Sequence, residues 1–269
     1  MKLRNKLMPA MLMLGVVAFS SCDKQENETI QPELEQGMIS HVMADSAEVT
    51  SYNFAGKQLD QVNHYDVETG NLESFEKYER DGKGRVLKSK IYAGSSQTLL
   101  SEQTFTYNSN GQLTQSSMAY YNGSKLEYTG YATYEYNDQT EVLEKKSVSE
   151  GKETAEDGKL KSYILYEALP NGNYTQEKQY VIDDNNEAKL FSTTTYSYDT
   201  SVNPFHAIAE PGTASSPNNL IASTTVVHNS KKTYKYTYSY TYDERGYPLT
   251  QTVITPKGTR STYKYLYSN

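Results

Sequence analysis

A strictly alternating run, "YKYTYSYTYD", occupies residues 234–243 near the end of this chain. Five tyrosines take every second position, and Lys, Thr, Ser and Thr fill the places between them. Because successive side chains of a β-strand point to opposite faces, the run predicts a strand with one tyrosine face and one small polar face. Tyr263, Tyr265 and Tyr267 form a second stripe of this kind. Cross-strand aromatic pairs each contribute roughly 0.2–1 kcal/mol, so tyrosine ladders can hold such a sheet together.

The composition makes tyrosine the main core-forming residue. Leu, Ile, Val and Phe together supply only 48 of 269 residues, a share that with high net charge usually indicates disorder. The chain also has 26 tyrosines and no tryptophan. Each tyrosine brings a large apolar ring and one hydroxyl that needs water or a partner. We therefore expect a folded core built from tyrosine rings.

A turn phrase recurs from about residue 47 onward. It consists of an aromatic strand end, Asp or Asn, a short turn, Gly, any residue and an aliphatic residue. Its copies are YDVETGNL from Tyr65, YERDGKGRVL from Tyr78, FTYNSNGQL from Phe105, YEYNDQTEVL from Tyr134 and YTYDERGYPL from Tyr240. Asp and Asn cap turns with their side chains and Gly supplies positive φ, so the phrase is typical of β-hairpins.

Turns of no fixed form lie between these phrases, for example "AGSS" from Ala93, "PNGN" from Pro170 and "DDNNE" from Asp183. The phrase turns near Gly84, Gly111 and Thr140 are 27 and 29 residues apart. One repeat unit is therefore two strands, with a fixed turn at one end and a variable turn at the other. This predicts an all-β fold, a long antiparallel meander of about 16 strands.

A sheet of 16 strands has to curl or split. A closed barrel, a wrapped half-barrel and two stacked sheets all fit the pattern. A barrel that spans the outer membrane does not, because its strands must show an apolar face to lipid, and here the second face is Lys, Ser, Thr and Gln.

Residues 1–21 read as a lipoprotein signal peptide. A basic start is followed by an apolar run from Leu7 to Phe19, which is too short to span a membrane with margin. Two serines then precede Cys22, the only cysteine of the chain, and this arrangement resembles a bacterial lipobox. We expect Cys22 to be acylated and to anchor the protein in the outer membrane. The alternative is an ordinary signal peptide followed by an incidental cysteine.

Residues 22–46 are polar and acidic without periodicity, which predicts a flexible tether before a single β domain at residues 47–269. The acidic cluster after Cys22 resembles the surface-export signal of Bacteroidetes lipoproteins. It favours the cell surface over the periplasmic leaflet. "DSA" at residues 45–47 resembles the O-glycosylation site of the same phylum, with Ser46 as the acceptor.

The charge and the motif content argue against several functions. The formal charge is −7, and removal of residues 1–21 would take away three positive charges and leave −10, which repels nucleic acid. His41, His64, His206 and His228 are scattered, without metal-ligand spacing. No nucleophile elbow or phosphate loop occurs. The sequence predicts no metal, no cofactor and no enzymatic activity.

The segment from Asp199 to Asn219 is the one long irregular element, "DTSVNPFHAIAEPGTASSPNN". Loops of this length in compact folds are usually functional or disordered. Phe205, His206 and Ile208 are apolar or amphipathic enough to pack. We interpret the segment as a plug or cover over the tyrosine face, with a free binding loop as the alternative.

Two resemblances extend over the β domain. "DGKGRVL" and "YDERGYPL" resemble the YD repeats of the rearrangement-hotspot family, whose large proteins wind repeats into shells around toxins; this chain is far too short to enclose such cargo. "YSYDTSVNPF" from Tyr196, "PNNLI" from Pro217 and "YDERGYPL" from Tyr242 resemble small Bacteroidetes lipoproteins of unknown function. The resemblance covers roughly residues 50–269 and implies a fold and a location, without a catalytic site.

Two hypotheses for the function follow. In the first, the protein is a non-catalytic surface module that binds a glycan or an envelope protein through exposed aromatic residues. The expected binding face comprises Tyr236, Tyr238, Tyr240, Tyr263, Tyr265, Phe205 and His206. In the second, the protein is a purely structural or assembly module in which every tyrosine stripe is buried. The solvent exposure of the tyrosines discriminates between them.

Overall fold

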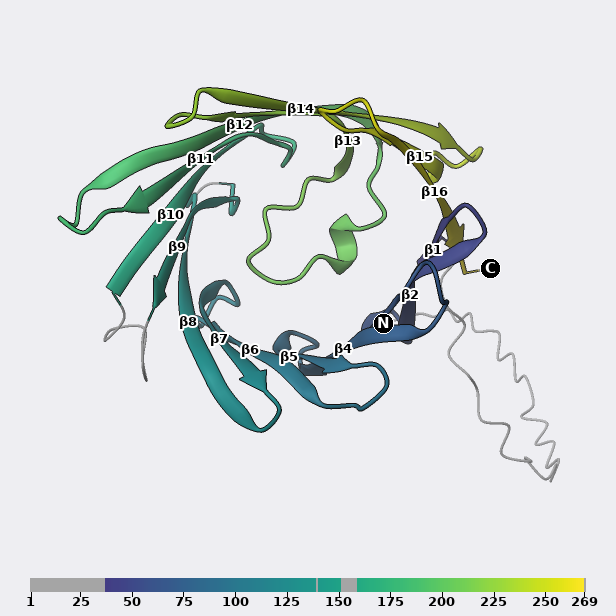
Figure 1. Ribbon diagram of the computed structural model, residues 1–269, viewed down its shortest axis with the longest axis horizontal. Coiled ribbons are helices and arrows are strands. Elements are labelled where there is room, and N and C mark those ends of the chain that lie inside the picture. The colour runs from purple at the N-terminus through teal and green to yellow at the C-terminus, as the bar shows by residue number, and fades with distance from the viewer. Residues whose placement is uncertain (1–36, 139, 151–158, 269) are drawn as a thin grey trace, which may run out of the picture. The chain divides into compact units, whose positions relative to one another are not determined.

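A computed structural model describes residues 37–138, 140–150 and 159–268. In these residues sixteen antiparallel strands follow one another around a closed barrel (Figure 1). Each strand pairs with its neighbour in sequence, and β1 closes the ring by pairing with β16. The predicted all-β meander of about 16 strands is confirmed, and of the three arrangements left open the chain adopts the barrel.

The strand bounds show the regularity of the meander. The first eight strands are β1 (Ile39–Ala44), β2 (Ala47–Ala55), β3 (Gln58–Tyr65), β4 (Leu72–Arg80), β5 (Val86–Ala93), β6 (Leu99–Tyr107), β7 (Leu113–Asn122) and β8 (Lys125–Tyr136). The others are β9 (Leu143–Glu150), β10 (Lys159–Ala168), β11 (Tyr174–Ile182), β12 (Ala188–Val202), β13 (Asn218–Val227), β14 (Lys232–Tyr242), β15 (Pro248–Ile254) and β16 (Arg260–Tyr267). The one helical element of the described residues is the short 3₁₀ helix η1 (His206–Ile208). No helix in this part of the chain is long and apolar enough to cross a membrane.

The turn phrase forms because its Asp or Asn caps the turn. The Oδ1 atoms of Asp81, Asn108 and Asp243 each accept hydrogen bonds from the backbone N–H groups two and four residues later. The glycine three residues after each has a φ of 84°, 88° and 85°, a conformation that glycine adopts at little cost. The turn at Asp183 has the same capping pattern, with Asn186 at a φ of 62° in the place of glycine. The capping side chain therefore defines the turn, and glycine is its usual companion.

Tyrosine hydroxyls tie successive turns together at one end of the barrel. Three hydroxyls donate to backbone carbonyls 19 to 21 residues earlier, on the neighbouring strand. These bonds join Tyr107 to Val86 (2.7 Å), Tyr240 to Leu220 (2.9 Å) and Tyr267 to Pro248 (2.7 Å). In each case the ring enters the core while the hydroxyl meets a backbone acceptor, which is what a buried tyrosine requires.

The strand order assigns each turn to one of the two barrel ends. Four phrase turns lie at one end, which we call the plug end, since the segment 203–217 joins β12 to β13 there. "PNGN", expected among the variable turns, also lies at the plug end, between β10 and β11. The phrase from Tyr65 lies at the opposite end, between β3 and β4. The same turn chemistry thus occurs at both ends of the barrel. The expected unit, with phrase turns at one end and variable turns at the other, therefore holds only in part.

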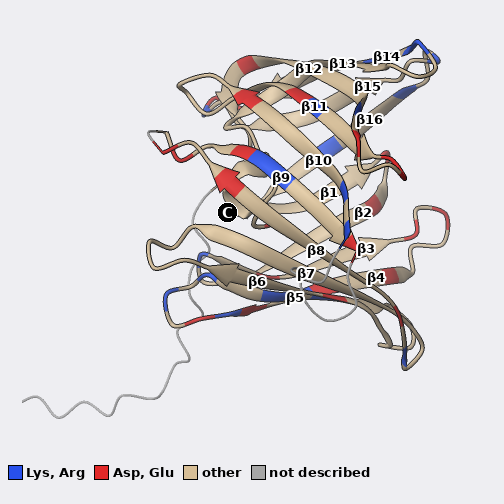
Figure 2. Ribbon diagram, turned by 90° about the vertical axis from the view of Figure 1, so that its left-hand side faces the viewer, with Lys and Arg blue, Asp and Glu red and all other residues tan. Residues whose placement is uncertain are grey.

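The two faces of the barrel wall differ in the way that the alternation predicts. In β14, Tyr240 faces Gln251 of β15, which in turn faces Tyr263 of β16, so these residues share the inner face. Ser239 and Thr241 point outward between the tyrosines. Charged residues of both signs lie along the strands and turns (Figure 2). In β14 the outer face is therefore small and polar, and the inner face is rich in tyrosine.

The segment 203–217 lies inside the ring of strands (Figure 1). Phe205 and Ile208 of this segment pack against a core cluster that comprises Ile39, Val42 and Tyr265 with Tyr52, Tyr263 and Tyr267 around it. Ala214 packs against a second cluster, which comprises Val86, Phe105, Leu113, Ala132, Tyr134, Leu143 and Tyr174. The interpretation of the segment as a plug is confirmed, and we call residues 203–217 the plug segment.

Residues 39–44, which the sequence assigned to the flexible tether, form strand β1. Ile39 is fully buried and Val42 faces Tyr265 across the β1–β16 pair, so this short strand belongs to the core. Its apolar signal is only "I..V", and the acidic residues before it obscured it. Cys22 and the predicted signal peptide lie outside the described residues.

Gly212 tests the seating of the plug segment. Its φ is +79°, and a β-carbon at this position would collide with the Tyr134 ring. Gly258, in an exposed turn, has a φ of +81° and open space around it. Alanine introduces the same backbone strain at both positions, so Gly258→Ala controls for that strain. Gly212→Ala also overpacks the contact with Tyr134, so it should lower the free energy of unfolding by about 1–3 kcal/mol more than Gly258→Ala does. Urea unfolding measures both, and equal losses would contradict the contact with Tyr134.

Candidate functional site in the barrel lumen

The base of the plug segment is fixed by a network of Asn and Asp side chains. Asn203 donates to the Ser216 carbonyl (2.9 Å) and accepts from the Phe205 N–H (3.0 Å). Asn219 donates to the Val202 carbonyl (3.1 Å), and its own N–H donates to Asp199 (3.1 Å). These bonds explain why the irregular segment begins with "NPF" and ends with "PNN". The plug segment is therefore fixed by side-chain hydrogen bonds at both of its ends.

A second set of bonds ties this base to the barrel wall. The Asn173 amide donates to Asn218 Oδ1 (2.9 Å), and the Tyr174 N–H donates to Ser216 Oγ (3.1 Å). The Tyr242 hydroxyl donates to Asp199 Oδ2. Burial, followed by the Asp199 carboxylate, raises the pKa of Tyr242 well above its usual range. The plug segment thus divides the lumen at a fixed position.

The expected binding face is graded in its exposure. Tyr236 is 36% exposed, whereas Tyr265 is 5% exposed. Tyr238, Tyr240 and Tyr263 are half-buried. The gradient follows the barrel axis, because the buried end of each stripe meets the plug segment. Tyr265 is thus a core residue, since plug residues have covered its ring.

The two loop residues of that face behave differently. The Phe205 ring packs edge-on against Tyr265 (centroids 5.5 Å apart, 85°) and lies 6.1 Å from the Tyr52 ring. His206 is exposed and its Nδ1 lies 3.3 Å from Ser215 Oγ, so the expectation that it packs is wrong. It is the first residue of η1, directly after Phe205. A pocket of about 180 Å³ brings Phe205, Tyr240 and Tyr265 together without His206 or Tyr236.

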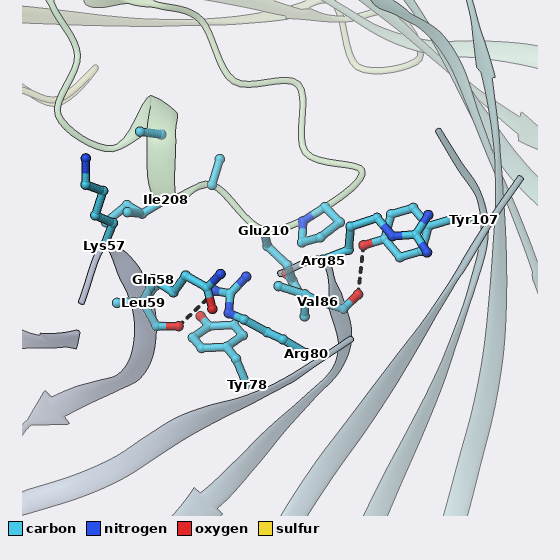
Figure 3. A pocket seen from close by; sticks show the side chains of 13 residues that line it. Lys57, Gln58, Leu59, Tyr78, Arg80, Arg85, Val86, Tyr107, Ile208 and Glu210 are labelled. Carbon is cyan, nitrogen blue, oxygen red and sulfur yellow. Dashed lines mark hydrogen bonds between the residues drawn. The ribbon is translucent and has the colours of Figure 1, made fainter. Parts of the chain in front are cut away.

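A larger pocket, of about 350 Å³, lies between the plug segment and the turns after β2 and β4 (Figure 3). Its charged lining residues are Lys57, Arg80, Arg85 and Glu210. Arg80 donates to the carbonyls of Leu59 (2.8 Å) and Gly84 (2.9 Å). Arg85 pairs with the capping Asp81 (2.7 Å). Both guanidinium groups therefore hold turns in place, and we assign this pocket a structural role.

Glu210 carries a half-buried carboxyl group into the lumen from the plug segment. Ser89 donates to its Oε1 (3.2 Å). Burial raises the pKa of the Glu210 carboxyl above its ordinary value, and repulsion from Glu76 adds to this, while Ser89 and Lys146 act in the opposite direction. Burial in turn lowers the pKa of Lys146, whose Nζ lies 5.6 Å from the centre of the Tyr134 ring. The lumen at this point destabilises charges of both signs.

A pH profile of stability tests this environment. Above the ordinary carboxyl pKa of 4.5 the unfolded chain releases a proton that folded Glu210 retains, so the stability contributed by this group falls as pH rises toward its folded pKa. Glu210→Gln should remove this fall and should leave the protein more stable than wild type near neutral pH. Urea unfolding from pH 4 to 8 measures it, with exposed Glu244→Gln as control. A variant profile that parallels wild type would show that Glu210 is solvated.

A third pocket, of about 260 Å³, lies between the plug segment and strands β10–β13. We call it the tyrosine pocket; its principal lining side chains are Tyr166, Tyr174, Tyr196, Tyr198 and Glu177. The Tyr166 and Tyr174 rings meet edge to face (5.6 Å, 66°), and the Tyr196 and Tyr198 rings are tilted by 41° (6.4 Å). Four rings and one carboxylate thus surround a small space.

Electrostatics place Glu177 close to three of these phenols. Burial raises the pKa of Tyr166, Tyr196 and Tyr198, and the Glu177 carboxylate raises all three further. For Tyr166 and Tyr196, Glu177 is the largest cause of the raised pKa after burial. Tyr174 is satisfied differently, because its hydroxyl accepts from the Leu143 N–H (3.2 Å). Sequence reasoning missed this pocket, although Tyr196 and Tyr198 directly precede "NPF" and were a signal for it.

The types of side chain that line the lumen limit the chemistry available there. The described residues contain no group of three His, Cys, Asp or Glu side chains that could hold a metal ion. Among the described residues, Glu177 is the one carboxylate that lines the tyrosine pocket, so these residues offer no carboxylate pair there. Rings with polar edges beside one carboxylate are instead typical of groups that orient a small ligand.

Comparison with known proteins gives a fold. No family model matches the chain, and no curated protein matches it. Among solved structures it is similar to a porin-like protein from Bacteroides uniformis ATCC 8492, with 18% identity, a TM-score of 0.51, and coverage of 88% of this chain and 99% of that one. A porin-like protein from Bacteroides vulgatus ATCC 8482 is 13% identical, with a TM-score of 0.49 and coverage of 86% and 98%. At such identities the first similarity shows a shared barrel fold, and the second, with a TM-score below 0.5, adds no argument.

Proposed function

We propose that this protein is a lipid-anchored, non-catalytic binding protein of the cell envelope, and that its lumen holds a small ligand against tyrosine rings. The observation that carries the proposal is the tyrosine pocket. The plug segment covers Tyr265, but about 260 Å³ remain beside four other rings and Glu177. A glycan is one ligand class that stacks on such rings, as the sequence suggested.

The polarity of the wall supports a barrel that stands in water. Glu135 lies between the inward-facing Tyr134 and Tyr136, so it points outward, where it pairs with Lys145 (2.6 Å). Outward pairs also join Lys90 to Glu79 (2.6 Å). A barrel that crosses a membrane needs an apolar outer band, so these pairs argue against a porin-like role for this chain.

The anchor and the location rest on the sequence. The signal peptide, Cys22 and the acidic residues that follow it favour lipidation in the outer membrane and exposure at the cell surface. Ser46, the expected O-glycosylation site, is exposed in the turn between β1 and β2, where a modifying enzyme could reach it. We further propose that residues 1–21 are the signal peptide and that the barrel, from β1 onward, is the single domain.

The second candidate is the structural or assembly module. A specific observation favours it: of the five tyrosines expected to bind, Tyr265 is buried, and the Tyr240 hydroxyl is occupied by the Leu220 carbonyl and by the Gln251 amide (2.8 Å). Burial raises the pKa of Tyr240 to about 12. In this reading the rings serve only as core.

Lipidation is tested by metabolic labelling with radioactive palmitate. Cys22→Ala should abolish incorporation, because the acyl chains have no other cysteine to modify. Ser21→Ala keeps a small residue before the cysteine and should still be labelled. Label that persists in Cys22→Ala would contradict the anchor. Protease treatment of intact cells then separates the cell surface, where the protein is cleaved, from the periplasm, where it is protected.

Ligand binding is tested with an array of plant, host and microbial glycans. Loss of a stacked ring costs roughly 0.5–1.5 kcal/mol, so Tyr196→Ala, or Tyr238→Ala if the open stripe binds, should weaken a hit about threefold to tenfold. Tyr131→Ala, on the outer face, is the matched control. Thermal unfolding of each variant verifies the fold. Silence across the array and across small organic ligands would favour the structural module.

A further inference from the structure

The charge of the tyrosine pocket distinguishes it from its neighbour. The lining residues that the structure describes include Glu177 and no Lys, Arg or His. The 350 Å³ pocket on the other side of the plug segment has three cationic residues instead. No Lys or Arg is paired with Glu177 by an ion pair in the described residues. A half-buried carboxylate thus lies among phenol rings.

The rings approach the pocket from more than one direction. Tyr166 comes from β10, Tyr174 from β11, and Tyr196 and Tyr198 from β12. Within the two ring pairs the planes are inclined by 66° and 41°, so the four rings form no single flat platform. A sugar stacks best on one flat face. A compact cation is instead attracted to each ring face that lies within about 6 Å, and such contacts add up.

The carboxylate and the rings act on a ligand in the same sense. Glu177 lines the pocket beside Tyr166, Tyr196 and Tyr198 and raises the pKa of all three, so it supplies negative potential at these rings. Anionic ligands are therefore repelled and cations are attracted. The volume of about 260 Å³ lies just under the usual range for small-molecule sites, which suits a compact head group.

We infer that the tyrosine pocket binds an organic ammonium cation, of the choline or methylated-amine class, with the rings around the head group and Glu177 as its counter-ion. The inference rests on the proposed lumenal binding function and names its ligand class. The ligand's apolar methyl groups contact the rings, and its positive charge pairs with the carboxylate. Neutral isosteres gain the first interaction and lose the second.

Isothermal titration of the full chain with two probes of the same shape tests this inference. The probes are choline and its uncharged carbon isostere, 3,3-dimethylbutan-1-ol. Choline should bind at least tenfold more tightly than the isostere. Glu177→Gln should lower the choline affinity at least tenfold, whereas Glu167→Gln, on the outward, exposed side of β10, should leave it unchanged. Equal affinities for the two probes would overturn the inference. This comparison uses the wild-type protein alone, so it does not depend on whether a variant folds.

The remaining outcomes separate the inference from the proposed function. Glu177→Gln keeps the size of the side chain, and a melting temperature within a few degrees of wild type shows that it folds. A folded variant with unchanged choline affinity would overturn the counter-ion role and the inference with it. If choline fails while a neutral glycan binds and is lost in Tyr196→Ala, the inference fails and lumenal binding stands. If neither binds, both fail.

Discussion

The width of the barrel is the constraint on which the rest of the structure depends. Eight strands enclose a space that inward side chains can fill, whereas sixteen enclose far more. This chain fills the additional volume in two ways. It lines the wall with tyrosine, its largest aromatic side chain, and it folds residues 203–217 into the lumen. Phe205 and Ala214 of the plug segment reach two different core clusters, so one loop completes both.

Tyrosine can serve as core here because its hydroxyls meet partners at fixed places. Tyr107 and Tyr267 donate to backbone carbonyls beside the preceding turn, which satisfies the phenol and links one repeat to the next. Where the plug segment stops short of the wall, a space remains beside the paired rings, and the tyrosine pocket is such a space. The proposed binding site is thus a consequence of an incompletely filled barrel. Tyrosine thus stabilises the barrel and also lines the proposed binding site.

The strand number and the plug could be predicted because both depend on local pattern: alternation, capped turns and one long irregular segment. The closure could not, because pairing of β1 with β16 joins residues more than 200 apart. The tyrosine pocket was missed for a similar reason, since Tyr166, Glu177 and Tyr196 come from three strands that only the register aligns. Tyr265 was expected to bind and lies in the core, because alternation gives the face of a side chain and says nothing about what covers it.

Spectrophotometric titration of the phenols tests the tyrosine-filled barrel most directly. Burial raises the pKa of thirteen of the 26 tyrosines, to about 12 for Tyr52, Tyr136 and Tyr240. We predict two steps in the absorbance near 295 nm as pH rises, and the later step should have an amplitude that corresponds to these thirteen rings. The later step should coincide with alkaline unfolding. In concentrated urea the two steps should merge into one near pH 10. A folded protein whose tyrosines all ionise reversibly in one step near pH 10 would contradict it.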